Sequence, residues 1–203
     1  IGAVMNPLMH IFRERELSFM LKHGEAKVFI IPQTFRGFDY EKMVSELKPG
    51  LPHLQNVVVV DGKGPNSFEA LLSGPEWEKD PQASILRKHR PGPDDVTQLI
   101  YTSGTTGEPK GVMHTANTTM ANIIPYAERL QLNAQDVVLM ASPMAHQTGF
   151  MYGLMMPIML KASAVILDVW DPLRAIDLIC QEGATFTMAS TPFLSDLAKN
   201  VHD

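Results

Sequence analysis

Hydrophobic and polar positions follow two different periods along the first half of the chain. Some segments place apolar residues every three to four positions, which is typical of helices with one buried face. Others are short, continuous apolar runs, which are typical of strands buried in a sheet. The helical period stops at Gly24 in one segment and just before Pro49 in another, and both residue types terminate helices. These patterns predict helices at 13–23 and 40–47 and buried strands at 27–31 and 57–60.

The second half continues the same alternation. It predicts strands at 96–102, 112–114, 136–140, 164–167 and 185–188, and helices at 116–130, 147–160, 171–181 and from Thr191 onward. Residues 61–95 interrupt the alternation with clustered glycine and proline around one short helix, 67–73. We interpret this stretch as an irregular loop region and not as a domain boundary, because the strand at 96–102 needs partners from the first half. The alternation predicts an α/β fold with a mostly parallel sheet flanked by helices.

Composition narrows the functional classes. The chain has 203 residues, of which 45% are hydrophobic, so it can bury a sizeable core. The net charge of -5 gives no reason to expect nucleic acid or an anionic membrane surface as a partner. Cys180 is the one cysteine and cannot form an internal disulfide, which favours a reducing, cytoplasmic setting. No apolar run is long enough to predict a transmembrane helix.

The densest chemical signal lies at 99–112, Leu-Ile-Tyr-Thr-Ser-Gly-Thr-Thr-Gly-Glu-Pro-Lys-Gly-Val. An apolar strand runs here into a loop of glycine, serine and threonine that ends at Lys110. Glycines let backbone N–H groups approach an anion, hydroxyl groups donate hydrogen bonds, and the lysine adds a mobile positive charge. This combination favours a polyphosphate ligand. The candidate phosphate-binding residues are Thr102, Ser103, Gly104, Thr105, Thr106, Gly107 and Lys110.

Three other interpretations of this loop are weaker. In a Walker A loop the lysine precedes serine or threonine, whereas Lys110 precedes Gly111 and Val112. The dinucleotide-binding pattern Gly-x-Gly-x-x-Gly does not fit either. A surface turn without a ligand would seldom combine so many hydroxyl groups and glycines with a lysine.

Residues 101–112 resemble the phosphate-binding motif of the AMP-forming acyl-CoA synthetases, adenylate-forming enzymes that also include luciferases and peptide-synthetase adenylation domains. Further segments resemble the same family with lower specificity: 6–7, 13–17, 26–30, 142–150 and 183–192. Within the family, the sequences of 111–118 and 142–153 most resemble those of the branch of short- or medium-chain fatty acyl-CoA and cyclohexanecarboxylate-CoA ligases. One departure is Ala116, which stands where many relatives have histidine.

The resemblance implies a reaction in two steps. A carboxylate attacks the α-phosphorus of ATP to give acyl-AMP and pyrophosphate, and the thiol of coenzyme A then displaces AMP. By resemblance, the loop holds the β- and γ-phosphates, Lys110 is the catalytic residue that neutralises the leaving pyrophosphate, and Thr102 helps to position Mg²⁺. The implied cofactors are ATP and Mg²⁺, with coenzyme A as co-substrate and a carboxylic acid as the group that is activated.

Residues 142–150 resemble a Pro-x-x-His-x-x-Gly motif that borders the acyl pocket in the family. The resemblance implies His146, Thr148 and Gly149 as residues of the acyl pocket region. An isolated histidine between apolar residues is also typical of a hydrogen-bonded structural group. Nearby methionines suit either an adaptable acyl pocket or ordinary core packing: Met144, Met151, Met155, Met156 and Met159.

The resemblance also implies further motifs beyond residue 203. We therefore expect residues 1–203 to be part of a larger N-terminal domain, with its C-terminal half and a small C-terminal domain absent, and to be inactive alone. Uncovered apolar faces at 151–160 and 185–201 predict that this piece either forms a homodimer or aggregates. Two alternatives stay open: an adenylating enzyme with another acceptor, by carrier-protein loading or luciferase-like oxidation, and a non-catalytic nucleotide-binding module. The parent protein is expected in the cytoplasm, and its peripheral association with a membrane is left open.

Overall fold

The computed structural model describes residues 2–72, 79, 84, 88–102 and 108–201. The chain divides into two compact units. The first comprises Ile1–Ala3, His10–Pro91 and Tyr101–Val112, and the second comprises Val4–Met9, Gly92–Ile100 and Met113–Asp203. Five of the candidate phosphate-binding residues lie outside the described residues: Ser103, Gly104, Thr105, Thr106 and Gly107.

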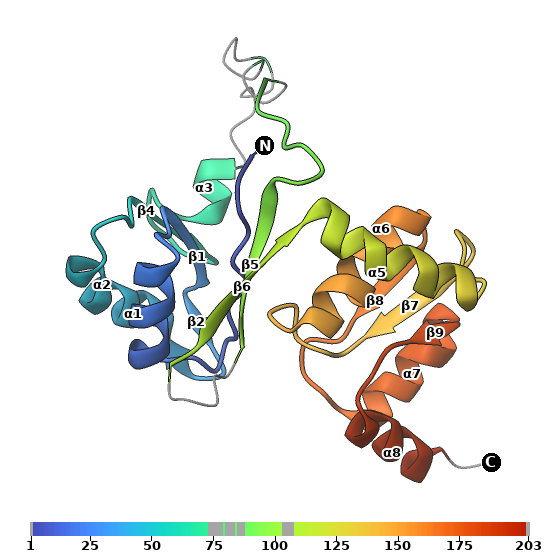
Figure 1. Ribbon diagram of the computed structural model, residues 1–203. Coiled ribbons are helices and arrows are strands. Elements are labelled where there is room, and N and C mark those ends of the chain that lie inside the picture. Colours follow the sequence, from blue (N-terminus) through green and yellow to red (C-terminus); the bar gives the residue numbers. More distant parts are fainter. Residues whose placement is uncertain (1, 73–78, 80–83, 85–87, 103–107, 202–203) are drawn as a thin grey trace. The chain divides into compact units, whose positions relative to one another are not determined.

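The first unit contains a parallel strand pair with a crossover helix (Figure 1). Its elements are α1 (Glu14–His23), β1 (Val28–Pro32), β2 (Thr34–Phe35), β3 (Phe38–Asp39), α2 (Tyr40–Leu47), the short 3-10 helix η1 (Lys48–Gly50), β4 (Asn56–Val60) and α3 (Phe68–Leu72). In the β1–β4 pair, Val28 lies opposite Asn56 and Pro32 lies opposite Val60. The chain between the two strands passes through α2, because a parallel pair needs a long connection.

The helices of this unit begin where the sequence supplies caps. The Asp39 carboxylate accepts a hydrogen bond from the Lys42 N–H at the start of α2, and the Glu16 carboxylate accepts one from the Arg13 N–H at the start of α1. α1 contacts α2, and α2 packs on β1. The core of this unit consists of apolar side chains that are nearly inaccessible to solvent: Leu17, Met20, Leu21, Ile31, Tyr40, Met43, Val44 and Val59.

β5 (Val96–Thr102) pairs with β6 (Lys110–Thr115). The seven residues between them are too few for a parallel crossover, so the pair is an antiparallel hairpin. The N-terminal segment joins β5 as well, since the Met5 N–H donates to the Thr97 carbonyl at 2.9 Å and the Leu99 N–H donates to the Met5 carbonyl at 2.8 Å. The strand predicted at 96–102 therefore finds one partner in the first half of the chain, as expected, and another in the strand that follows it.

The second unit contains a parallel sheet of three strands in the order β8-β7-β9. Its elements are α5 (Ala116–Arg129), β7 (Val137–Met140), η4 (Gly149–Met155), α6 (Met156–Leu160), β8 (Ser163–Ile166), α7 (Pro172–Glu182), β9 (Phe186–Thr187) and α8 (Thr191–Asn200). In the register of this sheet, Val138 lies opposite both Ala164 and Phe186.

Consecutive residues of the central strand β7 pack on opposite faces of the sheet, as a pleated strand requires. Val138 packs with side chains of α5, η4 and α6, whereas Leu139 packs with Leu167 and with Ala175 of α7. Figure 1 shows α5 and α6 on one side of these strands and α7 and α8 on the other. Helices therefore cover both faces of a parallel sheet, which confirms the predicted α/β fold.

The structure differs from three predictions, which concern the sheet, the strand at 27–31 and the helix at 147–160. The described strands form four small sheets and not one continuous sheet. β1 is buried on one face, since Ile31 is buried while Val28 and Ile30 are about half exposed. The segment 147–160 is not a uniform α-helix, because η4 is a π-helix that continues into α6. None of the helices in the described part of the chain is long and apolar enough to cross a membrane.

Candidate functional site

Two of the candidate phosphate-binding residues lie at the same end of the β5–β6 hairpin. Thr102 is the last residue of β5 and Lys110 is the first residue of β6, and antiparallel pairing brings these strand ends together. Both residues are exposed. The hairpin thus presents a hydroxyl group before the glycine-rich segment and an ammonium group after it.

Tyr101 fastens this end of β5 to α1. Its hydroxyl group donates a hydrogen bond to the Met20 carbonyl at 3.1 Å and lies 2.9 Å from Nδ1 of His23. The hydroxyl has one proton and the carbonyl can only accept, so Nδ1 of His23 is the donor in the second bond. Burial raises the pKa of the Tyr101 hydroxyl, so the proton of the first bond stays in place further into the alkaline range.

An aromatic cluster completes this attachment. Phe19 stacks on His23 with ring centroids 5.3 Å apart, and it meets the Tyr101 ring edge-on at 6.3 Å. Two side chains of α1 therefore contact the side chain next to Thr102. These contacts hold Tyr101, the residue before Thr102, against α1.

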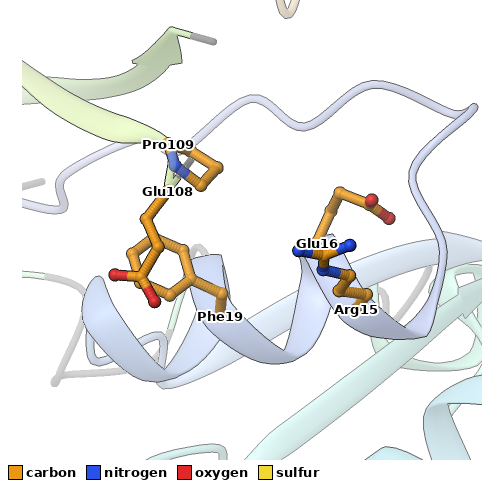
Figure 2. Close-up of a pocket in the computed structure, with 5 residues that line it drawn as sticks. All are labelled: Arg15, Glu16, Phe19, Glu108 and Pro109. Carbon is orange, nitrogen blue, oxygen red and sulfur yellow. The ribbon is translucent and has the colours of Figure 1, made fainter. Parts of the chain in front are cut away.

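A pocket of about 330 Å³ lies between α1 and the two residues that precede Lys110. Figure 2 shows its lining, with Arg15 and Glu16 at one end and Phe19, Glu108 and Pro109 at the other. The rings of Phe19 and Pro109 supply apolar surface, Arg15 supplies a guanidinium group, and two carboxylates complete the lining. Its volume is at the lower end of the range for small-molecule sites.

Glu16 is held in its charged form. The Arg13 N–H donates to its carboxylate at 3.2 Å, and this backbone hydrogen bond, assisted by the positive charge of Arg15, lowers the pKa of Glu16. The sequence did not point to any of the five pocket residues as a site. Two features of the sequence could have indicated them. Residues 13–17 resemble a segment of the family, although the resemblance assigns no function to Arg15 or Glu16, and Glu108 and Pro109 lie inside the phosphate-binding motif.

The second group of candidate residues lies in one tight turn after β7. The His146 N–H donates to the Pro143 carbonyl at 2.9 Å, and the Phe150 N–H donates to the His146 carbonyl at 3.0 Å. The Thr148 N–H donates to Nδ1 of His146 at 3.2 Å. Nδ1 is therefore an acceptor, so the neutral ring carries its proton on Nε2. Because His146 is exposed, Nε2–H is a donor that a ligand could use.

Two positions of η4 require glycine because the backbone makes close approaches there. A Cβ atom at Gly149 would lie 2.2 Å from the Pro143 oxygen and 2.5 Å from the Ser142 oxygen. At Gly153 it would lie 2.4 Å from Cγ of Met140, a residue of β7 that is fully buried. The π-helix thus rests directly on the turn and on the end of β7. Such helices are rare and are frequent at functional sites.

The methionines near this turn divide into two groups. Met151 and Met156 are buried members of the core cluster that also contains Val138. Met155 and Met159 are partly buried against the same cluster, and Met144 is partly buried next to Gly153. Core packing therefore accounts for Met151 and Met156, and the pocket role of the other three stays a prediction.

The α/β fold and the glycine-, serine- and threonine-rich sequence that ends in Lys110 agree with the family resemblance of residues 101–112. The sequence model of the family described as "AMP-binding enzyme" matches residues 1–203, and the chain belongs to this family. The predicted family is thus confirmed.

Individual relatives agree with this assignment. The medium-chain fatty-acid–CoA ligase of Escherichia coli (strain K12) is 36% identical over 197 residues, which cover 97% of this chain and 34% of that protein. Apo MbtA of Mycobacterium smegmatis is 25% identical with a TM-score of 0.80, over 98% of this chain and 36% of its own. ATP-bound MatB from Rhodopseudomonas palustris shares the fold, with a TM-score of 0.76 and 22% identity over 98% of this chain and 36% of its own. The chain spans about a third of the length of these relatives.

Proposed function

We propose that the protein to which this chain belongs is an ATP-dependent acid-thiol ligase, an AMP-forming acyl-CoA ligase. It activates a fatty or alicyclic carboxylic acid as acyl-AMP and transfers the acyl group to coenzyme A. The proposal is supported by Thr102, the last residue of β5, and Lys110, the first residue of the neighbouring β6, in a chain that matches the AMP-binding family throughout.

Lys110 acts on the leaving group of the first step. As an oxygen of the acid attacks the α-phosphorus of ATP, the bond from this phosphorus to the bridging oxygen breaks and negative charge grows on pyrophosphate. An ammonium group that stays close to the β- and γ-phosphates offsets this charge. Strand pairing fixes the backbone of Lys110, and the side chain reaches from there into solvent. Ser103, Gly104, Thr105, Thr106 and Gly107 contribute hydroxyl and N–H donors in the same proposal.

Thr102 fits a Mg²⁺ site that is shared with the phosphates of ATP. Its hydroxyl oxygen is the hard type of ligand that Mg²⁺ prefers, and the residue is exposed at the strand end next to Lys110. When bound, Mg²⁺ supplies further neutralisation of the phosphate charge. Thr102 would hold the ion from the protein side.

His146, Thr148 and Gly149 belong to the site of the acid in this proposal. The bond from the Thr148 N–H fixes the His146 ring, so its Nε2–H is an oriented donor. Gly149 keeps the backbone of η4 against the turn that carries this ring. In the second step the thiolate of coenzyme A attacks the acyl carbonyl carbon and AMP leaves. The reaction thus requires no covalent bond to the enzyme.

We place this chemistry in the cytoplasm, supported by the unpaired and exposed Cys180, which fits a reducing compartment. Exposed apolar side chains on α6, on α8 and just after it support self-association of this chain as a homodimer. These side chains are Ile158, Leu194 and Val201.

Two measurements on the whole enzyme test the proposed function. The first follows pyrophosphate release from ATP with a panel of fatty and alicyclic acids, and the second follows thioester formation after coenzyme A is added. Acid-dependent pyrophosphate release followed by acyl-CoA supports the proposal. Release without a thioester indicates another acceptor, and no acid-dependent release with any acid refutes adenylation of these substrates.

A further inference from the structure

His23, the last residue of α1, holds the hydroxyl group of Tyr101. Nδ1 of His23 lies 2.9 Å from the hydroxyl oxygen and donates to it, and the hydroxyl in turn donates to the Met20 carbonyl at 3.1 Å. The Met20 oxygen also accepts the hydrogen bond of the Gly24 N–H at 2.9 Å, so the backbone at the end of the helix fixes this oxygen. The Tyr101 hydroxyl therefore has two partners, of which only His23 is a side chain.

The imidazole ring of His23 is itself held in place. Phe19 lies four positions earlier on the same face of α1 and stacks on this ring, with centroids 5.3 Å apart and 15° between the planes. The Tyr101 ring meets the imidazole edge-on at 5.8 Å and 70°. His23 is nevertheless exposed, so water can replace its hydrogen bond at little cost to the fold. The bond thus orients Tyr101 more than it stabilises the protein.

α1 lies beside the chain both before and after residues 103–107. On the first side, His23 holds Tyr101, the neighbour of Thr102 at the end of β5. On the second side, Phe19 lies in the lining of the same pocket as 108–109, just before β6 (Figure 2). Successive side chains of a strand point to opposite faces, so holding the Tyr101 ring against α1 also sets the direction of the Thr102 side chain.

We propose that His23 is a positioning residue for ATP, which acts through Tyr101 to direct the Thr102 hydroxyl group toward the phosphates. This inference rests on the proposed function, which assigns Thr102 and Lys110 to the phosphates. Without the donor of His23, the Tyr101 hydroxyl keeps its bond to Met20 but can pivot about it. Small displacements of a group that positions a substrate lower affinity and rate. One hydrogen bond corresponds to a factor of roughly 2–10 in an equilibrium constant.

Two substitutions in the whole enzyme separate the ring of His23 from its donor. His23→Phe keeps a ring that can stack on Phe19 and removes the donor, whereas His23→Asn removes the ring and keeps an N–H donor near the position of Nδ1. We expect His23→Phe to raise the Kd for ATP roughly 2–10-fold, measured by calorimetry with Mg²⁺ and without acid. We expect His23→Asn to bind ATP like wild type.

Kinetics and stability distinguish positioning from a general loss of structure. In pyrophosphate release, His23→Phe should raise the KM for ATP and leave the KM for the acid unchanged. Because the lost hydrogen bond is exposed, the melting temperature should fall by about 1 °C or less. His53→Phe is the matched control, since His53 is an exposed histidine in the turn before β4, and it should leave the Kd for ATP unchanged.

A double-mutant cycle tests whether His23 acts through Tyr101. Tyr101→Phe removes the hydroxyl that His23 contacts, so it should raise the Kd for ATP at least as much as His23→Phe does. In the Tyr101→Phe background, His23→Phe should then change the Kd no further. Effects that add in the double variant would mean that His23 acts by another route.

Four results would overturn the assignment of His23. They are an unchanged Kd in His23→Phe, an equal loss of affinity in His23→Asn, additive effects in the cycle, or the same loss in the His53 variant. A wild-type enzyme that binds ATP but releases no pyrophosphate with any acid would refute the proposed function instead, so the two failures are distinguishable.

Discussion

Gly149→Ala is expected to destabilise the fold, because the added methyl group has no room. Its Cβ atom would lie 2.2 Å from the Pro143 oxygen, whereas carbon and oxygen atoms in favourable contact are about 3.3–3.6 Å apart. The two must therefore separate by about 1 Å. The Pro143 oxygen also accepts the hydrogen bond of the His146 N–H, so this movement disrupts the turn that carries His146.

Two terms set the size of the effect. Overpacking a well-packed site costs about 1–3 kcal/mol, and loss of a hydrogen bond costs about 0.5–1.5 kcal/mol. The middle of these ranges gives about 3 kcal/mol. Each kcal/mol lowers the melting temperature by about 2–4 °C in a domain of about 150–250 residues, and by proportionately less in a larger protein. Because this chain spans about a third of the length of its relatives, we expect a decrease of about 2–4 °C for the whole enzyme.

Thermal unfolding of the whole enzyme, followed by dye fluorescence, measures this decrease. Gly50→Ala is the control, because its φ angle is not positive and a Cβ atom there would meet nothing within 4 Å. We expect the control to melt at or slightly above the wild-type temperature. If the Gly149 variant melts with the control, the turn has more room than the close approach implies and the argument from packing is wrong.

Three further changes test other parts of the site. Lys110→Ala should lower acid-dependent pyrophosphate release about 10²–10³-fold, the usual effect of losing one electrostatic donor, and an unchanged rate would remove Lys110 from the mechanism. Tyr101→Phe should lower the melting temperature, since it removes two hydrogen bonds worth about 0.5–1.5 kcal/mol each. Burial raises the pKa of Tyr101 above 10.0 in the folded state, so its contribution to stability is present below about pH 10 and is lost as the pH rises further. If the melting temperatures of wild type and variant fall equally at alkaline pH, this prediction is wrong. The pKa of Glu16 is lowered in the folded state, so its carboxylate stabilises the fold above about pH 4.5 and this contribution is lost as the pH falls further. Glu16→Gln lacks the carboxylate, so its melting temperature should be lower than that of wild type above this pH and should approach it in acid. Melting curves of both proteins over a range of pH check this.

Elements with local start and stop signals were predictable from the sequence. The structure places α2 at Tyr40–Leu47, the range predicted, because Asp39 caps its first turn and Pro49 follows its end. The strand predicted at 96–102 is β5, where an apolar run ends at the polar loop. Both predictions depend on residues inside or next to the element, so no long-range contact was needed to make them.

Elements that depend on close backbone approaches were not predictable. Periodicity predicts one helix at 147–160, but the π-helical turn depends on how Gly149 and Gly153 rest on other segments. The β2–β3 hairpin was also missed. Its turn residues, Arg36 and Gly37, both have positive φ, and arginine is an uncommon residue for that conformation.

The candidate site shows the same division. Lys110 and Thr102 could be named as candidates from the sequence, because a glycine- and hydroxyl-rich loop that ends in lysine indicates a polyphosphate ligand and resembles the motif of the family. The pocket was missed because Arg15 and Phe19 meet Glu108 only after folding, across more than eighty positions of sequence. His23 was passed over because its partner lies 78 positions away in the sequence.

Three features between Ser142 and Met155 oppose stability. This short stretch contains a π-helical segment, the buried amide of Gln147, which has no partner among the described residues, and a glycine whose backbone lies directly against two carbonyl oxygens. A buried amide without a partner among the described residues also occurs at Gln98, so such an amide does not by itself mark a functional segment. The π-helical segment and the close approach of Gly149 are different in kind, because both fix the path of the backbone. They lie in the stretch that resembles the acyl-pocket motif, and π-helical turns are frequent at functional sites, so the backbone, and not the buried amide, supports a site here.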